Sequence, residues 1–176
     1  MGWNTTMPSG FTDGQTVDEA DLDPIVENLN FVRYASVFMG GIRRTTTVTG
    51  ITSSEIAVMQ TPNVTFEAGY LYKIEGAYKY NSSSGTNYVL ELRIHEGAGL
   101  GGAVIQSFGT PNISYNNIGY QAYFSVNVKI TSGVVRPYTL GVRSIAGLGT
   151  PGTHFCETTS WMSIYRSGDN ALMTDV

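Results

Sequence analysis

The chain has 176 residues and carries 10 basic against 14 acidic side chains, a formal net charge of −4 at pH 7. Its length fits one domain that buries a core without disulfides or a structural metal. The acidic balance excludes the cationic surface that nucleic-acid binding requires, so we expect no nucleic-acid partner. No apolar run approaches the roughly 20 residues of a membrane span, and the first residues do not resemble a signal peptide, so we expect no membrane insertion.

The first 15 residues are expected to form an extended arm. They combine Gly, Pro, Asn and Thr with two isolated aromatic residues, Trp3 and Phe11, and they show neither a strand nor a helix period. A short helix is predicted next, because residues 16–19 have the pattern of a capping box and Pro24 suits the first turn of a helix. Its main part, residues 24–32, has one apolar stripe. A helix this short must dock, either on its own domain or on a neighbouring chain.

From residue 36 onward the apolar residues repeat with period two, which predicts strands. The clearest strand is 70–80, and we expect it to form a hairpin with 88–96 across a turn at 81–85. The other predicted strands are 38–48, 55–60, 64–66, 104–108, 113–115, 121–130, 138–145 and 159–166. With no helical pattern between them, they predict an all-β antiparallel sandwich, with a jelly roll as the first choice. The predicted domains are 1–36, an anchoring arm with the short helix, and 37–176, the jelly roll.

Few residues suit catalysis or metal binding. His95 is expected on the outward face of its strand beside Glu91 and Arg93, in a polar row that contacts water or a neighbouring chain. The motif His154-x-Cys156-Glu157 lacks the second ligand pair of a tetrahedral metal site, and Cys156 is predicted to be a buried, inert thiol. The acidic residues are scattered along the chain, although a tertiary pairing of two carboxylates stays open. We therefore expect no catalytic residue, no metal, no cofactor and no enzymatic activity.

The chain has 11 tyrosines, more than one small core can hold. Aromatic residues are enriched, and charges depleted, in the buried parts of subunit interfaces. We therefore predict a trimer interface formed by Tyr70, Tyr72, Tyr78, Tyr80 and Tyr120. In the alternative, the tyrosines face solvent or a sugar ligand, because aromatic rings also form platforms for carbohydrate.

A resemblance covers the first fifth of the chain. The matching residues are Phe11, Gly14, Val17, Ala20, Asp21, Leu22, Pro24, Ile25, Asn28, Leu29, Val32 and Arg33. This segment resembles the short leader of many tailed-bacteriophage virion proteins, including tail-fibre, head-fibre and capsid-decoration proteins, although Asp23 stands where the leader usually has Asn. The layout of 70–72, 87–95 and 155–165 is similar to the trimeric jelly rolls of the tumour-necrosis-factor and C1q type. No collagen-like or coiled stalk separates leader and head, which favours a compact knob.

The resemblance implies a non-enzymatic structural protein of a phage virion, with a homotrimeric capsid decoration protein as the first choice. Its partners would be two further copies of itself and the major capsid protein or another virion protein. It would be made in the host cytoplasm and lie on the exterior of the particle. The residues implied in anchoring are Trp3, Phe11, Leu22, Ile25, Leu29 and Phe31. The alternative is a tail-associated receptor-binding knob that recognises host surface glycans, and a third class is a monomeric carbohydrate-active enzyme.

Overall fold

The computed structural model describes residues 36–82, 89–110, 119–145 and 154–169, and the regular structure in these ranges is β-strand. The strands are β1 (Val37–Arg43), β2 (Val48–Ile51), β3 (Ile56–Gln60), β4 (Val64–Phe66), β5 (Tyr70–Ser82), β6 (Val89–Glu96), β7 (Val104–Gly109), β8 (Tyr120–Lys129), β9 (Val134–Arg136), β10 (Tyr138–Ile145), β11 (His154–Cys156) and β12 (Trp161–Asp169). The predicted all-β antiparallel class is confirmed for this part of the chain.

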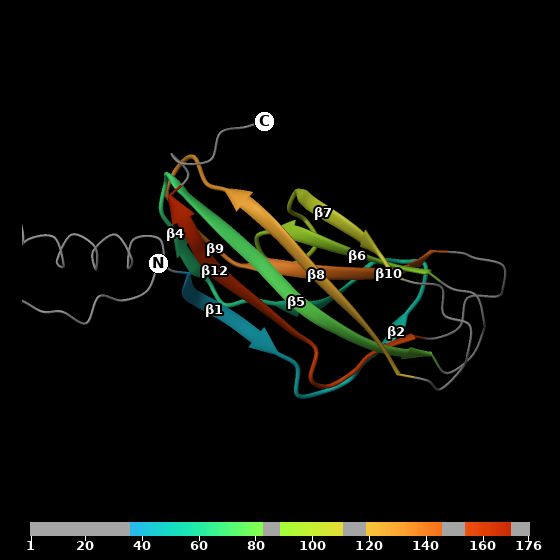
Figure 1. Cartoon of the computed structure of the whole chain (residues 1–176). Coiled ribbons are helices and arrows are strands. Elements are labelled where there is room, and N and C mark those ends of the chain that lie inside the picture. The colour runs from blue at the N-terminus through green and yellow to red at the C-terminus, as the bar shows by residue number, and fades with distance from the viewer. Residues whose placement is uncertain (1–35, 83–88, 111–118, 146–153, 170–176) are drawn as a thin grey trace, which may run out of the picture.

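Two antiparallel sheets lie face to face (Figure 1). In the first, which we call the β5 sheet, β5 pairs with β8 on one side and with β12 and then β11 on the other, and β1 and β2 extend it outward. The second, which we call the β10 sheet, has the order β3-β10-β6-β7. A small pair, β4 with β9, lies at one end of the sandwich.

The strand pairing is nested. Strand β1 pairs with β12, β3 with β10, β5 with β8, and β6 with β7, all antiparallel. The first and last strands of this set are therefore partners, and each further pair lies inside the previous one until the β6–β7 hairpin. A long antiparallel ribbon rolled into two sheets produces this order, which is that of a jelly roll.

The core lies between the two sheets, and alternation along each strand builds it. On β5, the inward residues Tyr72, Ile74 and Tyr78 are fully buried, and on β6 Leu92 and Ile94 are buried in the same cluster. The intervening residues of both strands point outward because successive side chains of a strand face opposite ways.

The predicted hairpin between 70–80 and 88–96 is wrong. Strands β5 and β6 belong to different sheets: β5 pairs with β8 and β12, whereas β6 pairs with β10 and β7. The physical reason is that each strand has one strongly apolar face, and two such faces are buried by packing against each other across the core rather than by lying side by side.

Most other predicted strands are confirmed. The prediction for 38–48 has to be divided, because β1 ends at Arg43 and the chain then turns, with the Arg44 backbone bonded to Ser160 and Thr159, before β2 begins. The predicted arm, the helix at 24–32 and the strand at 113–115 lie outside the described residues.

Candidate interaction surfaces

The outer face of the β5 sheet presents aromatic side chains in two rows across the strands. In one row Phe38 of β1 lies opposite Tyr165 of β12. In the other, Trp161 of β12 and Tyr123 of β8 lie on either side of Ala77 of β5. The rings of Phe38 and Tyr165 meet edge to face with their centroids 5.6 Å apart. Phe38 is 60% exposed and Tyr123 is 74% exposed. We call these four residues, Phe38, Tyr123, Trp161 and Tyr165, the aromatic face.

Charged side chains interrupt the aromatic face. Arg43 lies opposite Trp161 in one row, and Lys73 lies opposite Tyr165 in the other. Lys73 forms an ion pair with Glu75, which lies between the rows. Other neighbours of this pair across the strands are Ser125, Asn127 and Ser163, which are uncharged. Exposed aromatic rings gathered on one surface, with an arginine beside them, are typical of a surface that contacts another molecule.

The tyrosines predicted at a trimer interface occupy other positions. Tyr72 and Tyr78 are 0% exposed and Tyr80 is 1% exposed, so these three rings belong to the core of the protomer and have almost no surface to offer another chain. Tyr70 and Tyr120 are half-buried: the Arg166 guanidinium lies 4.6 Å from the Tyr70 ring centroid, and Tyr120 stacks on Tyr80. The trimer itself stays a prediction.

The aromatic face was not predicted from the sequence, because the interface was assigned to the tyrosine-rich side of 70–80. The opposite side of the same strand carries Lys73, Glu75 and Lys79, and charged residues are rarely buried without partners. That signal assigns the tyrosines to the core and the charged side to the surface. The anchoring residues implied by the leader lie outside the described residues: Trp3, Phe11, Leu22, Ile25, Leu29 and Phe31.

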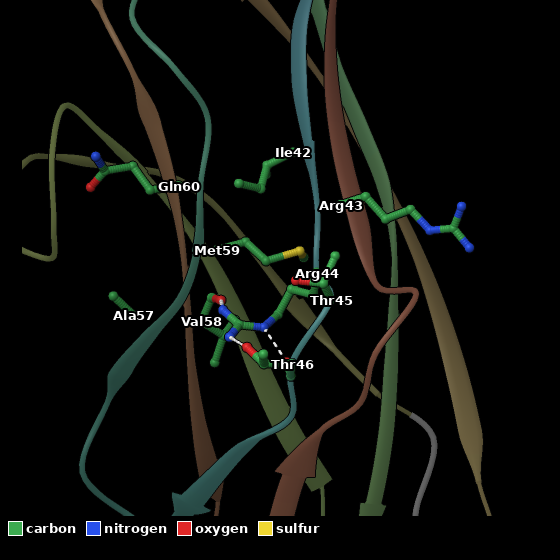
Figure 2. Close-up of a pocket in the computed structure, with 9 residues that line it drawn as sticks. All are labelled: Ile42, Arg43, Arg44, Thr45, Thr46, Ala57, Val58, Met59 and Gln60. Atoms are coloured by element: carbon green, nitrogen blue, oxygen red, sulfur yellow. Dashed lines mark hydrogen bonds between the residues drawn. The ribbon is translucent and has the colours of Figure 1, made fainter.

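A pocket of about 390 Å³ opens between the edge strands β1 and β3 (Figure 2). The Arg44 guanidinium reaches across it and donates hydrogen bonds to the Val58 carbonyl, to the Thr46 carbonyl at 2.9 Å and to Thr46 Oγ1 at 3.1 Å. Figure 2 shows Arg43 pointing away from these groups. Because its own chain occupies the donors of Arg44, this residue joins the edges of the two sheets, and we assign the pocket a structural role.

Cys156 is buried, as predicted, with a side chain 0% exposed. Its thiol donates to Ser160 Oγ at 3.6 Å, and burial raises the pKa of the thiol. Among the described residues no group of three or more His, Cys, Asp or Glu side chains is placed to hold a metal ion. The described part of the chain also contains no helix with the length and apolar character needed to cross a membrane.

Because Cys156 is buried, we expect its thiol to be alkylated slowly. Alkylation by iodoacetamide at neutral pH should be more than about tenfold slower in the folded chain than in urea, because the reactive thiolate is both disfavoured and shielded. The matched control is Val135→Cys in a Cys156→Ser background, since Val135 is 61% exposed. That variant should react at nearly the same rate folded and unfolded. Equal rates for Cys156 in the two states would contradict its burial.

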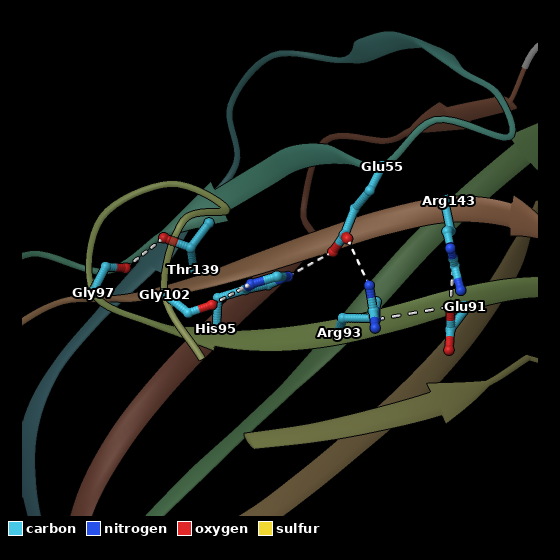
Figure 3. A network of polar contacts seen from close by, with 8 residues as sticks. All are labelled: Glu55, Glu91, Arg93, His95, Gly97, Gly102, Thr139 and Arg143. Atoms are coloured by element: carbon cyan, nitrogen blue, oxygen red, sulfur yellow. Dashed lines mark hydrogen bonds and ion pairs between the residues drawn. The ribbon is translucent and has the colours of Figure 1, made fainter. Parts of the chain in front are cut away.

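A network of ionic contacts covers the outer face of the β10 sheet (Figure 3). Glu55, just before β3, lies 2.6 Å from Nε2 of His95 and 3.0 Å from Nη1 of Arg93. Glu91 continues the network, with Arg93 Nε at 3.9 Å and Arg143 Nε at 2.5 Å. Burial alone would raise the pKa of the Glu55 carboxyl, but the hydrogen bonds and charges of His95 and Arg93 outweigh it and lower that pKa.

The expectation that His95 contacts water or a neighbouring chain is wrong for this protomer. The side chain does point outward beside Glu91 and Arg93, but it is only 3% exposed. Glu55 and the turn between β6 and β7 supply both hydrogen-bond partners of its ring. Nothing in the spacing of the sequence indicated Glu55 as its partner, because the two residues lie 40 positions apart.

Comparison with known proteins gives similarities of fold only. No family model and no curated protein matches the sequence. A chain in the structure of infectious bursal disease virus, Gt strain, aligns with a TM-score of 0.50 and 10% identity over 76% of this chain and 33% of the viral chain. The corresponding chain of the Gx strain aligns with a TM-score of 0.50 and 12% identity, over 77% of this chain and 34% of the viral chain. Eiger TNF from S. frugiperda aligns with a TM-score of 0.46 and 11% identity, over 80% of this chain and 99% of the Eiger chain.

The two viral similarities show that the jelly-roll fold is shared. This chain spans about a third of the length of those viral chains. The fold is therefore one that is also found in a virus particle, and the role of this chain is argued separately below.

Proposed function

We propose that this chain is a non-enzymatic structural protein of a tailed-phage virion, a homotrimeric decoration protein on the outside of the capsid. The observation that carries the proposal is the aromatic face, four aromatic side chains on the outer side of one sheet of a jelly roll, of which Phe38 and Tyr123 are more than half exposed. Its chemistry suits a lasting contact between folded chains. The jelly roll shared with a virus and the leader resemblance at 11–33 support the same assignment.

In this proposal the aromatic face joins three copies, and residues 1–36 of each copy anchor the trimer to the major capsid protein. Three linked arms act at a high effective concentration, so a weak contact by each arm gives a lasting attachment. The protein needs no catalytic group for this role.

The trimer is tested by the mass of the full chain in solution, measured by light scattering. We expect three times the chain mass for the wild type and the mass of one chain for the double variant Phe38→Lys/Tyr123→Lys, because the new charges would be buried between subunits. The matched control is Val135→Lys, which places a charge at a residue as exposed as Phe38 but on β9. A monomeric wild type, or a trimeric double variant, would overturn the assignment of the aromatic face.

Anchoring is tested separately with capsids that lack the protein. The full chain should bind them, whereas a chain without residues 1–15 should stay folded, by circular dichroism, and fail to bind. Wild-type occupancy by the truncated chain would contradict the anchoring role of the arm.

One feature favours the second candidate, a receptor-binding knob. Tyr123 and Trp161, together with Glu75 and Ser125, line a hollow of about 330 Å³ that also reaches inward to Gly76, Phe124 and Phe108 of β7. Aromatic rings, a carboxylate and a hydroxyl are the groups that a sugar ring and its hydroxyls would contact. A monomeric wild type that binds host-surface glycans and loses binding on Tyr123→Ala, with Val135→Ala unaffected, would support this candidate over decoration.

A further inference from the structure

His95 is held by two acceptors, and this determines its protonation. Nδ1 lies 3.2 Å from the Gly102 carbonyl oxygen, and Nε2 lies 2.6 Å from Oε1 of Glu55. A carbonyl oxygen can only accept, so Nδ1 carries a proton. The Glu55 carboxyl, with its pKa below the ordinary 4.5, is ionised at neutral pH and also accepts. A ring that donates from both nitrogens, an imidazolium, satisfies both of these contacts.

The charged groups around His95 fit this state. Glu55 faces it from the segment before β3, Arg93 and Glu91 from β6 itself, and Arg143 from β10, while the described residues of β7 and of the β6–β7 turn present no charged side chain to it. The signs alternate along the chain of contacts from the ring to Arg143. Each oxygen of the Glu55 carboxylate has one cationic partner, since Oε1 contacts His95 and Oε2 contacts Arg93. A neutral ring with its lone pair on Nε2 would leave Oε1 facing another acceptor.

The turn between β6 and β7, residues 97–102, is bound to the sheet through these contacts. Thr139 Oγ1 donates to the Gly97 carbonyl at 2.9 Å, and the Gly99 N–H donates to Gln60 Oε1 at 3.0 Å. Backbone bonds hold the two ends of the turn, from the Gly97 N–H to the Pro137 carbonyl and from the Glu96 N–H to the Ala103 carbonyl, both at 2.9 Å. The contact of His95 with the Gly102 carbonyl adds a side-chain attachment. The backbone at Gly102 passes so close to that of Glu96 that a Cβ there would lie 1.6 Å from the Glu96 carbonyl oxygen. The turn therefore takes this path only with glycine at position 102.

We propose that His95, Glu55 and the 97–102 turn form a proton-dependent latch. Protonated His95 ties the Gly102 carbonyl of the turn to Glu55 on the β10 sheet, and loss of one ring proton breaks that tie, while the backbone bonds from Glu96 to Ala103 and from Gly97 to Pro137 remain. The latched state binds one more proton than the released state, so raising the pH favours release. The proposal holds for a monomer or a trimer, and so it does not depend on the proposed function.

The latch is tested by NMR on the full chain, labelled with ¹⁵N, in a His154→Gln background so that His95 gives the only histidine ring signals. At about pH 6 both ring nitrogens should have the shifts of a protonated imidazolium. As the pH is raised, the ring should lose one proton, and the amide signals of Gly99, Gly101 and Gly102 should move with the same midpoint. A ring with one unprotonated nitrogen at about pH 6, or turn signals that do not follow the ring, would overturn the proposal.

Two variants separate the latch from a merely structural contact. In Glu55→Gln the side-chain amide can donate to Nε2 of a neutral ring, so the turn should stay bound and its amide signals should no longer follow the pH. In Thr139→Val the bond to Gly97 is lost but the latch is intact, so the pH-dependent movement should remain. An unchanged titration of the turn in Glu55→Gln, or its loss in Thr139→Val, would contradict the assigned roles.

Discussion

Replacing Tyr78 by alanine should lower the free energy of unfolding by about 3–5 kcal/mol, the range for truncating a large buried aromatic side chain. The ring is 0% exposed and stacks on Tyr80 with their centroids 5.4 Å apart. The strand that carries it pairs with β8 on one side and with β12 and β11 on the other, so the backbone has little freedom to collapse into the cavity. Replacing both Tyr72 and Tyr78 by lysine should prevent folding rather than separate subunits.

The matched control for Tyr78→Ala is Tyr123→Ala, which truncates the same side chain at a residue that is 74% exposed. In dilute protein, where association does not contribute, its free energy of unfolding should stay within about 0.5 kcal/mol of the wild type. Urea unfolding followed by circular dichroism measures both variants. Similar losses for the two would refute the division between core and surface tyrosines.

Adding a single methyl group to β5, in Gly76→Ala, should lower the free energy of unfolding by about 2–3 kcal/mol, as overpacking does in well-packed interiors. A Cβ at this position would lie 2.3 Å from the Trp161 carbonyl oxygen and 2.4 Å from Cζ of Phe124. The first of these atoms belongs to the backbone of β12 and the second to the ring of the residue opposite in β8. The Trp161 carbonyl cannot move without disturbing the pairing of β12 with the central strand, so rotation of the Phe124 ring alone would not relieve the overlap.

Gly101→Ala is the control for that steric argument, because a Cβ at Gly101 would meet no atom within 4 Å. Its effect should remain within about 0.5 kcal/mol. Urea midpoints and slopes for both variants provide the comparison. If Gly76→Ala unfolds at the same urea concentration as Gly101→Ala, then the close approach of Phe124 and β12 to Gly76 is wrong.

The strands could be predicted because the period of two is a local property of the sequence. For 64–66 and 138–145 the predicted ranges are those of β4 and β10. The partners of each strand could not be predicted in the same way. Strands β5 and β6 follow each other in the chain, yet their apolar faces meet across the core, and only the three-dimensional packing of all the faces together decides which strands share a sheet.

The surroundings of His95 and the aromatic face could not be predicted from the sequence for the same reason. The outward position of His95 follows from alternation along its strand, but its burial depends on Glu55, which lies just before β3, and on the turn between β6 and β7. The aromatic face likewise draws its residues from β1, β8 and β12. Residues that act together across strands leave no spacing in the sequence from which they could be recognised.

The nested pairing also has a consequence for how the chain folds as it is made. The partner of β1 is β12, and Val37 meets Arg166 almost a whole fold away along the chain. During synthesis β1 therefore has no partner until nearly all of the sandwich has left the ribosome, and Met39, which packs against the core in the folded chain, stays uncovered until then. Folds that depend on such distant contacts form slowly, over about milliseconds to seconds. The β6–β7 hairpin, whose strands are close neighbours in sequence, is the part best placed to form first.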